Sequence, residues 1–297
     1  MTKNNIDNSL IYTILENDKS VKEILLENLN FSRRLISKLS EYNKIYLNDK
    51  PAKLSKRVYI DDVLTIYFED EKEDEYPPVN IPLEVLYEDG SILAVNKPPF
   101  MVVHPTKSHF EDTLANGVRY YYDSKGIKSK IRFVNRLDMN TSGIVLIARN
   151  TYVHNELSKQ MKGNEVDKYY IAIAEGTILQ DEGTINAPIT RLNEEDIQRV
   201  VDPSGKESIT HYEVLKRFND MTLLKLKLET GRTHQIRVHL KHIRHPIVGD
   251  TLYNKESDLI NRQALHCSEM SFVHPITREK IVVKAEMPED MRKIIEK

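Results

Sequence analysis

The chain has 297 residues, of which 40% are hydrophobic and 30% are charged, a composition that is typical of a globular protein with a buried core and excludes a mainly disordered chain. Its formal net charge is -2, and its single cysteine, Cys267, excludes an internal disulfide and a zinc site built from several thiolates. The polar start MTKNNIDNSL and the lack of an apolar run of about 18 residues predict a cytoplasmic protein that does not enter a membrane.

Basic residues are concentrated near the N-terminus. The stretch from Phe31 to Ile60 contains eight basic and two acidic residues, and Arg33, Arg34 and Lys38 belong to it. Such a concentration of positive charge indicates a surface that binds the phosphates of a nucleic acid, but a merely solvated surface explains the charge equally well.

The same stretch predicts a small unit that contains both a helix and strands. Ser32 is placed to cap a helix in which Leu35, Ile36 and Leu39 share one face. KIYLNDKPA predicts a strand that enters a turn, and RVYIDDVLTIYF predicts a further extended stretch.

Residues 69–78, EDEKEDEYPP, join a run of charges to two prolines. A segment that repels itself and then stiffens is typical of a linker. We therefore expect two domains, residues 1–76 and residues 77–297.

Five segments between turn signals predict that the second domain is rich in strands: EVLYED, SILAVNK, GIVLIAR, YYIAIAE and MTLLKLKLE. In the last segment Leu224, Leu226 and Leu228 alternate with lysines, which indicates a strand with one buried face and favours antiparallel pairing. Helices are expected from Thr151 to Met161 and in a stretch capped by Thr233. The predicted fold class is therefore α+β.

Asp138 lies in the segment RFVNRLDMNTSGIVLIARN, between an apolar approach and a strand that is expected to be buried. Thr141, Ser142 and Gly143 predict a tight connection there, so the carboxylate is expected on a loop held by rigid structure. Arg136 is close enough in sequence to help keep it ionised, and an ionised aspartate is a candidate nucleophile. The alternative, an aspartate that only stabilises a turn, is favoured by local chemistry alone.

The stretch after Gly231 predicts a helix with Ile236, Leu240 and Ile243 on its buried face. A second row, Arg237, Lys241 and Arg244, has the same spacing and contains no acid, which indicates a face that follows a phosphate backbone rather than a merely solvated face.

Four histidines of this region suggest a metal site as an alternative: His234, His239, His242 and His245. The interleaved cations would repel a metal ion, and no carboxylate or thiolate lies among the histidines. We therefore expect them to pack or to bind phosphate, and we predict no metal.

The segment NRLDMNTSGIVLIARN resembles the catalytic motif of the RluA-type pseudouridine synthases, in which an Arg-Leu-Asp triplet precedes a Thr-Ser-Gly turn. Four further segments resemble the family in the same order: KPPFMVVHP (97–105), KYYIAIAEG (168–176), ETGRTHQIRVHLKHIRHPIVGDTLY (229–253) and RQALHCSEMSFVHPITREK (262–280). The likeness spans residues 81–290, and five motifs in the correct order make it specific. The N-terminal unit resembles an S4-like RNA-binding domain.

Two positions depart from the family pattern. Asn135 stands where many relatives have histidine, and Phe100 stands where many have glycine. Phe100 is not expected to adopt the backbone conformation that a glycine allows before His104.

The resemblance implies an isomerase that needs no cofactor and converts uridine to pseudouridine within structured RNA. It implies a long, bent, mostly antiparallel sheet with helices on its faces, and a cleft that contains Asp138 as the essential carboxylate. Asp138 attacks the ribose C1′, adds to uracil C6 or removes a ribose proton, and these routes stay open. Tyr170 is the implied stacking or proton-shuttling tyrosine, although a tyrosine on a strand is ordinarily structural. Arg237 or Arg232 pairs with the carboxylate, and Arg237 is favoured.

RNA is the predicted partner, and neither a membrane nor an obligate protein partner is indicated. The residues expected to contact RNA are Arg136, Arg232, Lys241 and Arg244 near the cleft, and Arg33, Arg34 and Lys38 in the first domain. Large-subunit ribosomal RNA is the first expected substrate and transfer RNA the second. Two rival readings are an RNA-binding protein without activity and a glycoside or nucleoside hydrolase, which would usually need a second carboxylate near Asp138.

Overall fold

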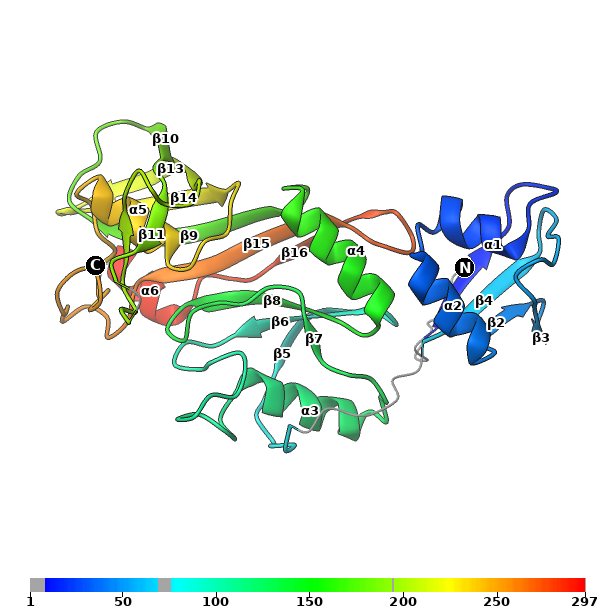
Figure 1. The fold of residues 1–297 in the computed structure, drawn as a ribbon. Helices are drawn as coiled ribbons and strands as arrows, with labels where there is room; N and C mark the ends of the chain where they lie inside the picture. The colour runs from blue at the N-terminus through cyan, green and yellow to red at the C-terminus, as the bar shows by residue number, and fades with distance from the viewer. Residues whose placement is uncertain (1–8, 69–75, 194, 297) are drawn as a thin grey trace.

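The computed structural model describes residues 9–68, 76–193 and 195–296. The helices and strands are arranged around two main sheets, a small one near the N-terminus and a long one formed by the rest of the chain (Figure 1). The predicted linker at residues 69–78 falls largely outside the described residues. Among the helices of the described ranges, none is long and apolar enough to cross a bilayer.

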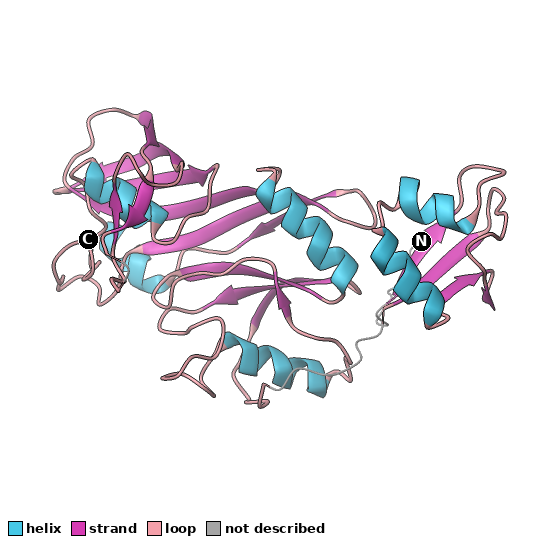
Figure 2. Ribbon diagram, viewed as in Figure 1, coloured by secondary structure: helices cyan, strands magenta, loops and turns pink. Residues whose placement is uncertain are grey.

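The N-terminal unit, residues 9–68, places its helices on one side of its sheet (Figure 2). The sheet has the order β1-β4-β2-β3 with antiparallel neighbours. The elements of the unit are β1 (Ser9–Thr13), α1 (Val21–Glu23), the π-helical turn η1 (Ile24–Asn28), α2 (Arg33–Glu41), β2 (Ile45–Leu47), β3 (Lys50–Pro51) and β4 (Val63–Tyr67).

The predicted helix of this unit is confirmed, and so is the predicted strand that enters a turn. The Ser32 side chain accepts a hydrogen bond from the Leu35 amide at 3.2 Å, and Ile36 and Leu39 are buried. The expected extended stretch from Arg57 is wrong in its first half. Residues 59–62 form a turn instead, because the Asp62 carboxylate accepts from the Tyr59 amide at 2.9 Å, and the strand begins only after it.

The long sheet is mostly antiparallel, as predicted, and its one parallel pair on the described path joins β8 to β15. In their order across the sheet, its strands are β10 (Glu182–Asn186), β13 (Ile209–Phe218), β14 (Met221–Leu228), β9 (Asp167–Glu175), β15 (Leu265–Val273), β8 (Ser142–Ala148), β6 (Ile92–Lys97) and β5 (Glu84–Glu88). β16 (Lys280–Lys284) pairs with β15, β7 (Arg132–Phe133) pairs with β8, and a separate ribbon joins β11 (Ile189–Arg191) to β12 (Arg199–Val201).

Two helices cover opposite faces of β8. Ile144, Leu146 and Ala148 belong to the core that contains α4 (Thr151–Lys162), whereas Val145 and Ile147 belong to the core under α3 (Leu114–Ser124). Since side chains alternate along a strand, burial on both faces explains why this segment is continuously apolar. β8 is therefore a rigid support at the centre of the fold.

Most predicted elements of the second domain are confirmed. The leucines of β14 are buried and its two lysines are partly exposed, and α4 begins after Asn150, whose side chain accepts from the Val153 amide at 2.9 Å. α3 and α6 (Glu289–Ile295) were not predicted from the sequence.

The helix expected after Gly231 is α5 (Gln235–His242), and its start differs from the prediction. Thr233 does not cap it. His234 occupies the cap position in a left-handed conformation, with φ 58°, and its side chain makes no capping hydrogen bond. Arg244 follows the helix with φ 65° and is therefore not part of a helical row with Arg237 and Lys241.

Candidate active site

Asp138 lies on the turn that connects β7 to β8. The Thr141 amide donates to the Asp138 carbonyl at 3.1 Å and closes the turn. Asn135 ties the approach to the strand, because its amide nitrogen donates to the Ile144 carbonyl at 3.1 Å and its side-chain oxygen accepts from the Leu146 amide at 2.8 Å. The carboxylate is thus carried by a short turn that the sheet holds.

The connection after Asp138 is shorter than expected, because Ser142 and Gly143 already belong to β8. Gly143 has φ 118°, and a Cβ atom at this position would lie 2.3 Å from the carbonyl oxygen of Cys267 on β15. Glycine is required here both by the conformation and by the close approach of the two backbones.

Lys97 holds the same turn from inside the protein. Its buried ammonium donates to the carbonyl oxygens of Pro98 and Met101 at 2.8 Å and of Met139 at 3.0 Å. Burial and the nearby Arg262 lower the pKa of Lys97 to about 7, and Asp138 offsets part of that shift. The sequence analysis did not single out this lysine.

A second buried cation connects the turn to the C-terminal helix. Arg262 donates to the Asn140 carbonyl at 3.2 Å and forms an ion pair with Asp290 of α6 at 2.7 Å. The neighbouring Gln263 donates to the Thr141 hydroxyl at 3.2 Å. Lys97 and the segment of Arg262 and Gln263 therefore fix the backbone that carries Asp138, and Asp290 of α6 holds Arg262 in place.

Arg237 links the Asp138 carboxylate to a second, buried carboxylate. Its Nη1 donates to Asp138 Oδ2 at 3.1 Å, while its Nε and Nη2 donate to the two oxygens of Asp250 at 2.7 Å each. Asp250 is fully buried, and Arg237 is 6% exposed. Burial alone would lower the pKa of Arg237, but the bonds to Asp250 and the charge of both carboxylates raise it, so the guanidinium stays charged.

His234 and Tyr253 complete the wall behind Asp138. His234 Nε2 lies 3.7 Å from Asp138 Oδ2, and its Nδ1 lies 2.9 Å from the Tyr253 hydroxyl. Burial lowers the pKa of His234 below its ordinary value, because the opposing attraction of Asp138 is weaker. Arg237 is positioned over the Tyr253 ring, 5.0 Å from its centre.

Tyr170 lies on β9, opposite Leu226 of β14 and Cys267 of β15. It is 8% exposed and lines the same pocket as Asp138. Burial, together with the neighbouring Cys267 thiol and the charge of Asp138, raises the pKa of Tyr170 well above its ordinary value. Its phenol is therefore protonated near neutral pH.

The pocket has a volume of about 210 Å³. Its lining consists of Arg136, Leu137, Asp138, Thr141, Tyr170, Leu228, Gly231, Arg232, Thr233, His234, Gln235, Ile236, Arg237 and Leu265. Among these described residues Asp138 is the one carboxylate, and Asp250 lies behind Arg237. A second carboxylate of the kind that glycoside hydrolysis usually needs does not line this pocket.

The structure separates the basic residues that the sequence analysis grouped. Arg136 and Arg232 line the pocket, but the cation in contact with Asp138 is Arg237, not Arg136. The expected continuous row of cations for a phosphate backbone is wrong, because Arg237 is buried by its two carboxylate partners, whereas Lys241 and Arg244 are exposed. Arg33, Arg34 and Lys38 lie on α2 in the N-terminal unit.

The four histidines of the metal alternative have different surroundings. His239 is buried between the Thr210 hydroxyl and the Ala187 carbonyl, at 2.9 Å from each, and His245 donates to the Glu175 carbonyl at 2.8 Å. His234 faces Asp138, and His242 is exposed. Within the described ranges, no group of side chains has the arrangement of a metal site.

The expectation about Phe100 is wrong. This residue adopts a left-handed backbone with φ 63°, as a glycine would. Its ring is largely exposed, so it does not have to fit a packed core, and the loop is held by the bonds from Lys97 and from the Met101 amide to the Met139 carbonyl at 3.2 Å.

Comparisons with known proteins show the family of the chain. Residues 91–242 match the family model described as RNA pseudouridylate synthase. An RNA pseudouridine synthase of Bacillus subtilis, YjbO, is 38% identical over 93% of this chain and 98% of its own length. Ribosomal large subunit pseudouridine synthase D of Buchnera aphidicola is 36% identical over 90% of each chain.

A solved structure shares the fold as well. Human RNA pseudouridylate synthase domain containing 1 superposes with a TM-score of 0.60 at 28% identity, covering 71% of this chain and 85% of the human one. Since both the family model and relatives that span nearly the whole chain agree, this chain belongs to the RNA pseudouridylate synthase family, whose members are isomerases that convert uridine to pseudouridine in RNA.

Proposed function

We propose that Asp138, Tyr170 and Arg237 carry the isomerisation, with Asp138 as the essential carboxylate. The observation that supports this most directly is the chain of contacts that begins at Asp138, in the pocket shared with Tyr170, and continues through Arg237 to the buried Asp250. A guanidinium held between two carboxylates orients the outer one toward the pocket. Arg237 acts on this carboxylate rather than on the base.

The reaction transfers uracil from its nitrogen to its carbon on the same ribose, so no atom is gained or lost. The bond from N1 to C1′ breaks, the base rotates, and a bond from C5 to C1′ forms; C5 loses a proton and N1 takes one up, so the protons balance. Asp138 serves as the nucleophile at C1′, as the nucleophile at uracil C6 or as the base that removes a ribose proton, and each route requires its charged form.

Tyr170 is assigned to the flipped base. A uridine inside folded RNA must leave its stack before the glycosidic bond is accessible, and an aromatic face that accepts the base offsets part of that cost. Since the Tyr170 phenol is protonated, it also supplies a proton donor beside the base.

Seven basic residues are assigned to RNA binding. Arg136 and Arg232 lie at the pocket, and Lys241 and Arg244 are exposed on or just after α5. Arg33, Arg34 and Lys38 lie on α2. The positive charges of these side chains attract the phosphates of RNA.

We assign residues 1–76 to an S4-like RNA-binding domain and residues 77–297 to the catalytic domain. Ribosomal RNA of the large subunit is the proposed substrate, because a relative at 36% identity is named a ribosomal large subunit pseudouridine synthase. A ribosomal RNA substrate supports a cytoplasmic location.

Pseudouridine mapping tests the assignment. Total RNA from cells with and without the protein is compared at single-nucleotide resolution. We expect loss of one or a few pseudouridines in large-subunit ribosomal RNA. Loss confined to transfer RNA would show that transfer RNA, not ribosomal RNA, is the substrate. An unchanged map would contradict the proposed activity.

A further inference from the structure

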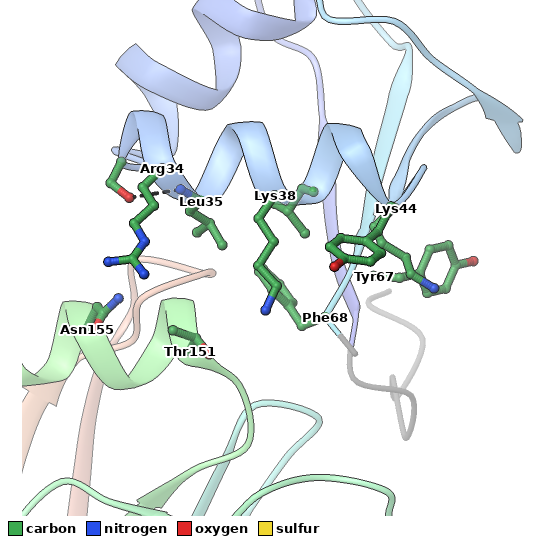
Figure 3. A pocket seen from close by; sticks show the side chains of 11 residues that line it. Arg34, Leu35, Lys38, Lys44, Tyr67, Phe68, Thr151 and Asn155 are labelled. Atoms are coloured by element: carbon green, nitrogen blue, oxygen red, sulfur yellow. Dashed lines mark hydrogen bonds between the residues drawn. The ribbon is translucent and has the colours of Figure 1, made fainter. Parts of the chain in front are cut away.

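The active-site pocket places an imidazole beside the proposed catalytic carboxylate without a direct hydrogen bond between them. His234 Nε2 lies 3.7 Å from Asp138 Oδ2, and the two side chains are 10% and 30% exposed. Hydrogen bonds from nitrogen to oxygen are shorter, about 2.7–3.2 Å. Figure 3 shows a larger groove between α2 and α4, but the described residues that line it include neither a histidine nor a carboxylate.

A hydrogen bond from Tyr253 determines which ring nitrogen of His234 carries the hydrogen. The Arg199 amide donates to the Tyr253 hydroxyl oxygen at 2.8 Å, and the same oxygen lies 2.9 Å from His234 Nδ1. Tyr253 is buried, and burial raises the pKa of its phenol, so the hydroxyl keeps its hydrogen. Among the described residues, His234 Nδ1 is the acceptor for that hydrogen. In a neutral imidazole the ring hydrogen then lies on Nε2, the nitrogen that faces Asp138.

The backbone and the surroundings hold this N–H group in one direction. His234 has φ 58°, a strained conformation for a residue other than glycine, and its side chain does not cap α5. Burial lowers the pKa of the ring, so it is neutral near neutral pH. The Tyr253 amide donates to Asp250 Oδ1 at 3.3 Å, which ties Tyr253 to the carboxylate that also binds Arg237.

A neutral donor beside a carboxylate selects a group that accepts from the first and donates to the second. An atom fits at about 2.8 Å from both His234 Nε2 and Asp138 Oδ2, because these are 3.7 Å apart. A phosphate oxygen and a uracil carbonyl oxygen accept hydrogen bonds but cannot donate to Asp138, whereas a hydroxyl group does both. Inside an RNA chain the 3′ and 5′ oxygens of a nucleotide form phosphate esters, so its one hydroxyl is the 2′-hydroxyl.

We propose that His234 Nε2 donates to the ribose 2′-hydroxyl of the target uridine while this hydroxyl donates to Asp138. This inference rests on the proposed function and makes His234 a residue that determines specificity in the same pocket. C2′ is bonded to C1′, so the contact keeps Asp138 close to the atoms that its three routes involve. The N3 edge of uracil also has a donor beside an acceptor, but a carboxylate bound there would be remote from C1′, C6 and the ribose protons. The pocket thereby distinguishes RNA from DNA at the target nucleotide.

Two versions of one RNA test this inference once the target uridine has been mapped. They differ only at the target, which is uridine in one and 2′-deoxyuridine in the other. Affinities are measured with Asp138→Asn, whose amide oxygen still accepts a hydrogen bond and which should bind RNA without converting it. The measured quantity is the ratio of Kd for the deoxy RNA to Kd for the unchanged RNA, with and without His234→Ala.

We expect a ratio of about ten for Asp138→Asn, because the deoxy RNA lacks both hydrogen bonds of the hydroxyl. Addition of His234→Ala should lower the ratio about fivefold, the effect of one neutral hydrogen bond. The affinity for the deoxy RNA should stay nearly constant, since that RNA has no hydroxyl to lose.

Tyr253→Phe, also in Asp138→Asn, tests the assigned ring hydrogen without removing the imidazole. The variant lacks the hydrogen that makes Nδ1 an acceptor, so the ring hydrogen no longer stays on Nε2 and the ratio should fall. Tyr121→Phe is the matched control, because it removes a hydroxyl that donates to Glu88 outside the pocket. His242→Ala removes an exposed histidine of the same helix. Neither control should change the ratio.

The inference is wrong if His234→Ala leaves the ratio unchanged, and also if it weakens binding of both RNAs equally, because the imidazole would then contact another group. If His234→Ala does not fold, an unchanged ratio in folded Tyr253→Phe overturns the inference instead. The binding samples are also analysed for pseudouridine. Product formed by Asp138→Asn would contradict the proposed function, whereas the ratio of Kd values reports on the 2′-hydroxyl.

Discussion

At the scale of single residues, the proposed catalytic carboxylate depends on partners that are distant in sequence. Arg237 is 99 residues from Asp138, Lys97 contacts the turn across 42 residues, and Arg262 contacts it across 122. The family motif indicated Asp138 and Arg237. Lys97, Asp250 and Arg262 lie within segments that resemble the family, but their roles were not predicted. A buried ion pair or a lysine bound to carbonyl groups leaves no periodic signal in the sequence.

Replacement of Tyr170 separates its ring from its hydroxyl. Tyr170→Phe keeps the stacking face, so RNA affinity should stay within a few fold, while loss of a proton transfer would slow single-turnover formation of pseudouridine by about a hundredfold or more. Tyr170→Ala should lose both affinity and rate. If the alanine variant is folded and as active as the phenylalanine variant, the ring has only a structural role.

Lys97 should give the stability a pH dependence of known sign. Its pKa is about 7 in the folded protein and about 10.4 in an unfolded chain. Between these values the unfolded chain binds more protons, so stability from this residue increases with pH, by at most about 1.4 kcal/mol per pH unit. Below pH 7 Lys97 is charged in both the folded and the unfolded chain, so the destabilisation by its buried charge no longer changes with pH.

Lys97→Met removes this titration and takes one donor away from each of three carbonyl groups. The variant should be less stable than the unchanged protein at pH 7, and the difference between them should widen at pH 9. Urea unfolding of both proteins at the two pH values measures it. An equal difference at both pH values would show that Lys97 keeps its charge throughout this range.

At the scale of elements, the strands were predictable and some helix ends were not. β14 alternates leucine with lysine, and β8 is apolar throughout because α3 and α4 cover both its faces. The start of α5 was misplaced because His234 adopts a left-handed conformation that is uncommon for residues other than glycine. The burial of Arg237 could not be read from its helical spacing, since its carboxylate partners lie outside the helix.

Gly143→Ala should destabilise the protein by about 3 kcal/mol or more, or prevent folding. The new Cβ would meet the backbone of Cys267, which cannot move aside as a side chain can, and φ 118° adds strain. Gly126→Ala is the matched control, because Gly126 also has positive φ but nothing within 4 Å, so it should cost about 1 kcal/mol. Equal losses in chemical unfolding would mean that β8 and β15 tolerate a wider separation.

At the scale of the whole molecule, the two sheets are separate but a single apolar cluster extends from the N-terminal unit into the catalytic part. The composition and the acidic, proline-ended segment predicted two domains. They did not predict contact between them, because Phe31, Phe68 and Tyr152 meet only in the folded chain. The net charge of -2 similarly conceals the basic surface of α2.

Removal of residues 1–76 should leave a folded core that retains chemistry at saturating RNA. Exposure of Tyr152 should lower Tm by roughly 5 °C. Affinity for the natural RNA and its dependence on salt should both fall, because up to eight cations between Arg33 and Arg57 are lost. Single-turnover rates at limiting and saturating RNA, over a range of salt, measure these effects.

Two outcomes of the truncation would contradict this division of roles. A saturated rate that collapses in a folded core would place part of the active site in the N-terminal unit. Unchanged affinity and salt dependence would show that its basic face is only solvated.

Asp138→Asn tests the central claim most directly. The substitution removes the charged oxygen but little contact area, so RNA affinity should stay within a few fold while pseudouridine formation is abolished. The measurement is the single-turnover yield of pseudouridine at saturating RNA, with binding of the same RNA as the control for folding. A rate near that of the unchanged protein would contradict the assignment of Asp138 as the essential carboxylate.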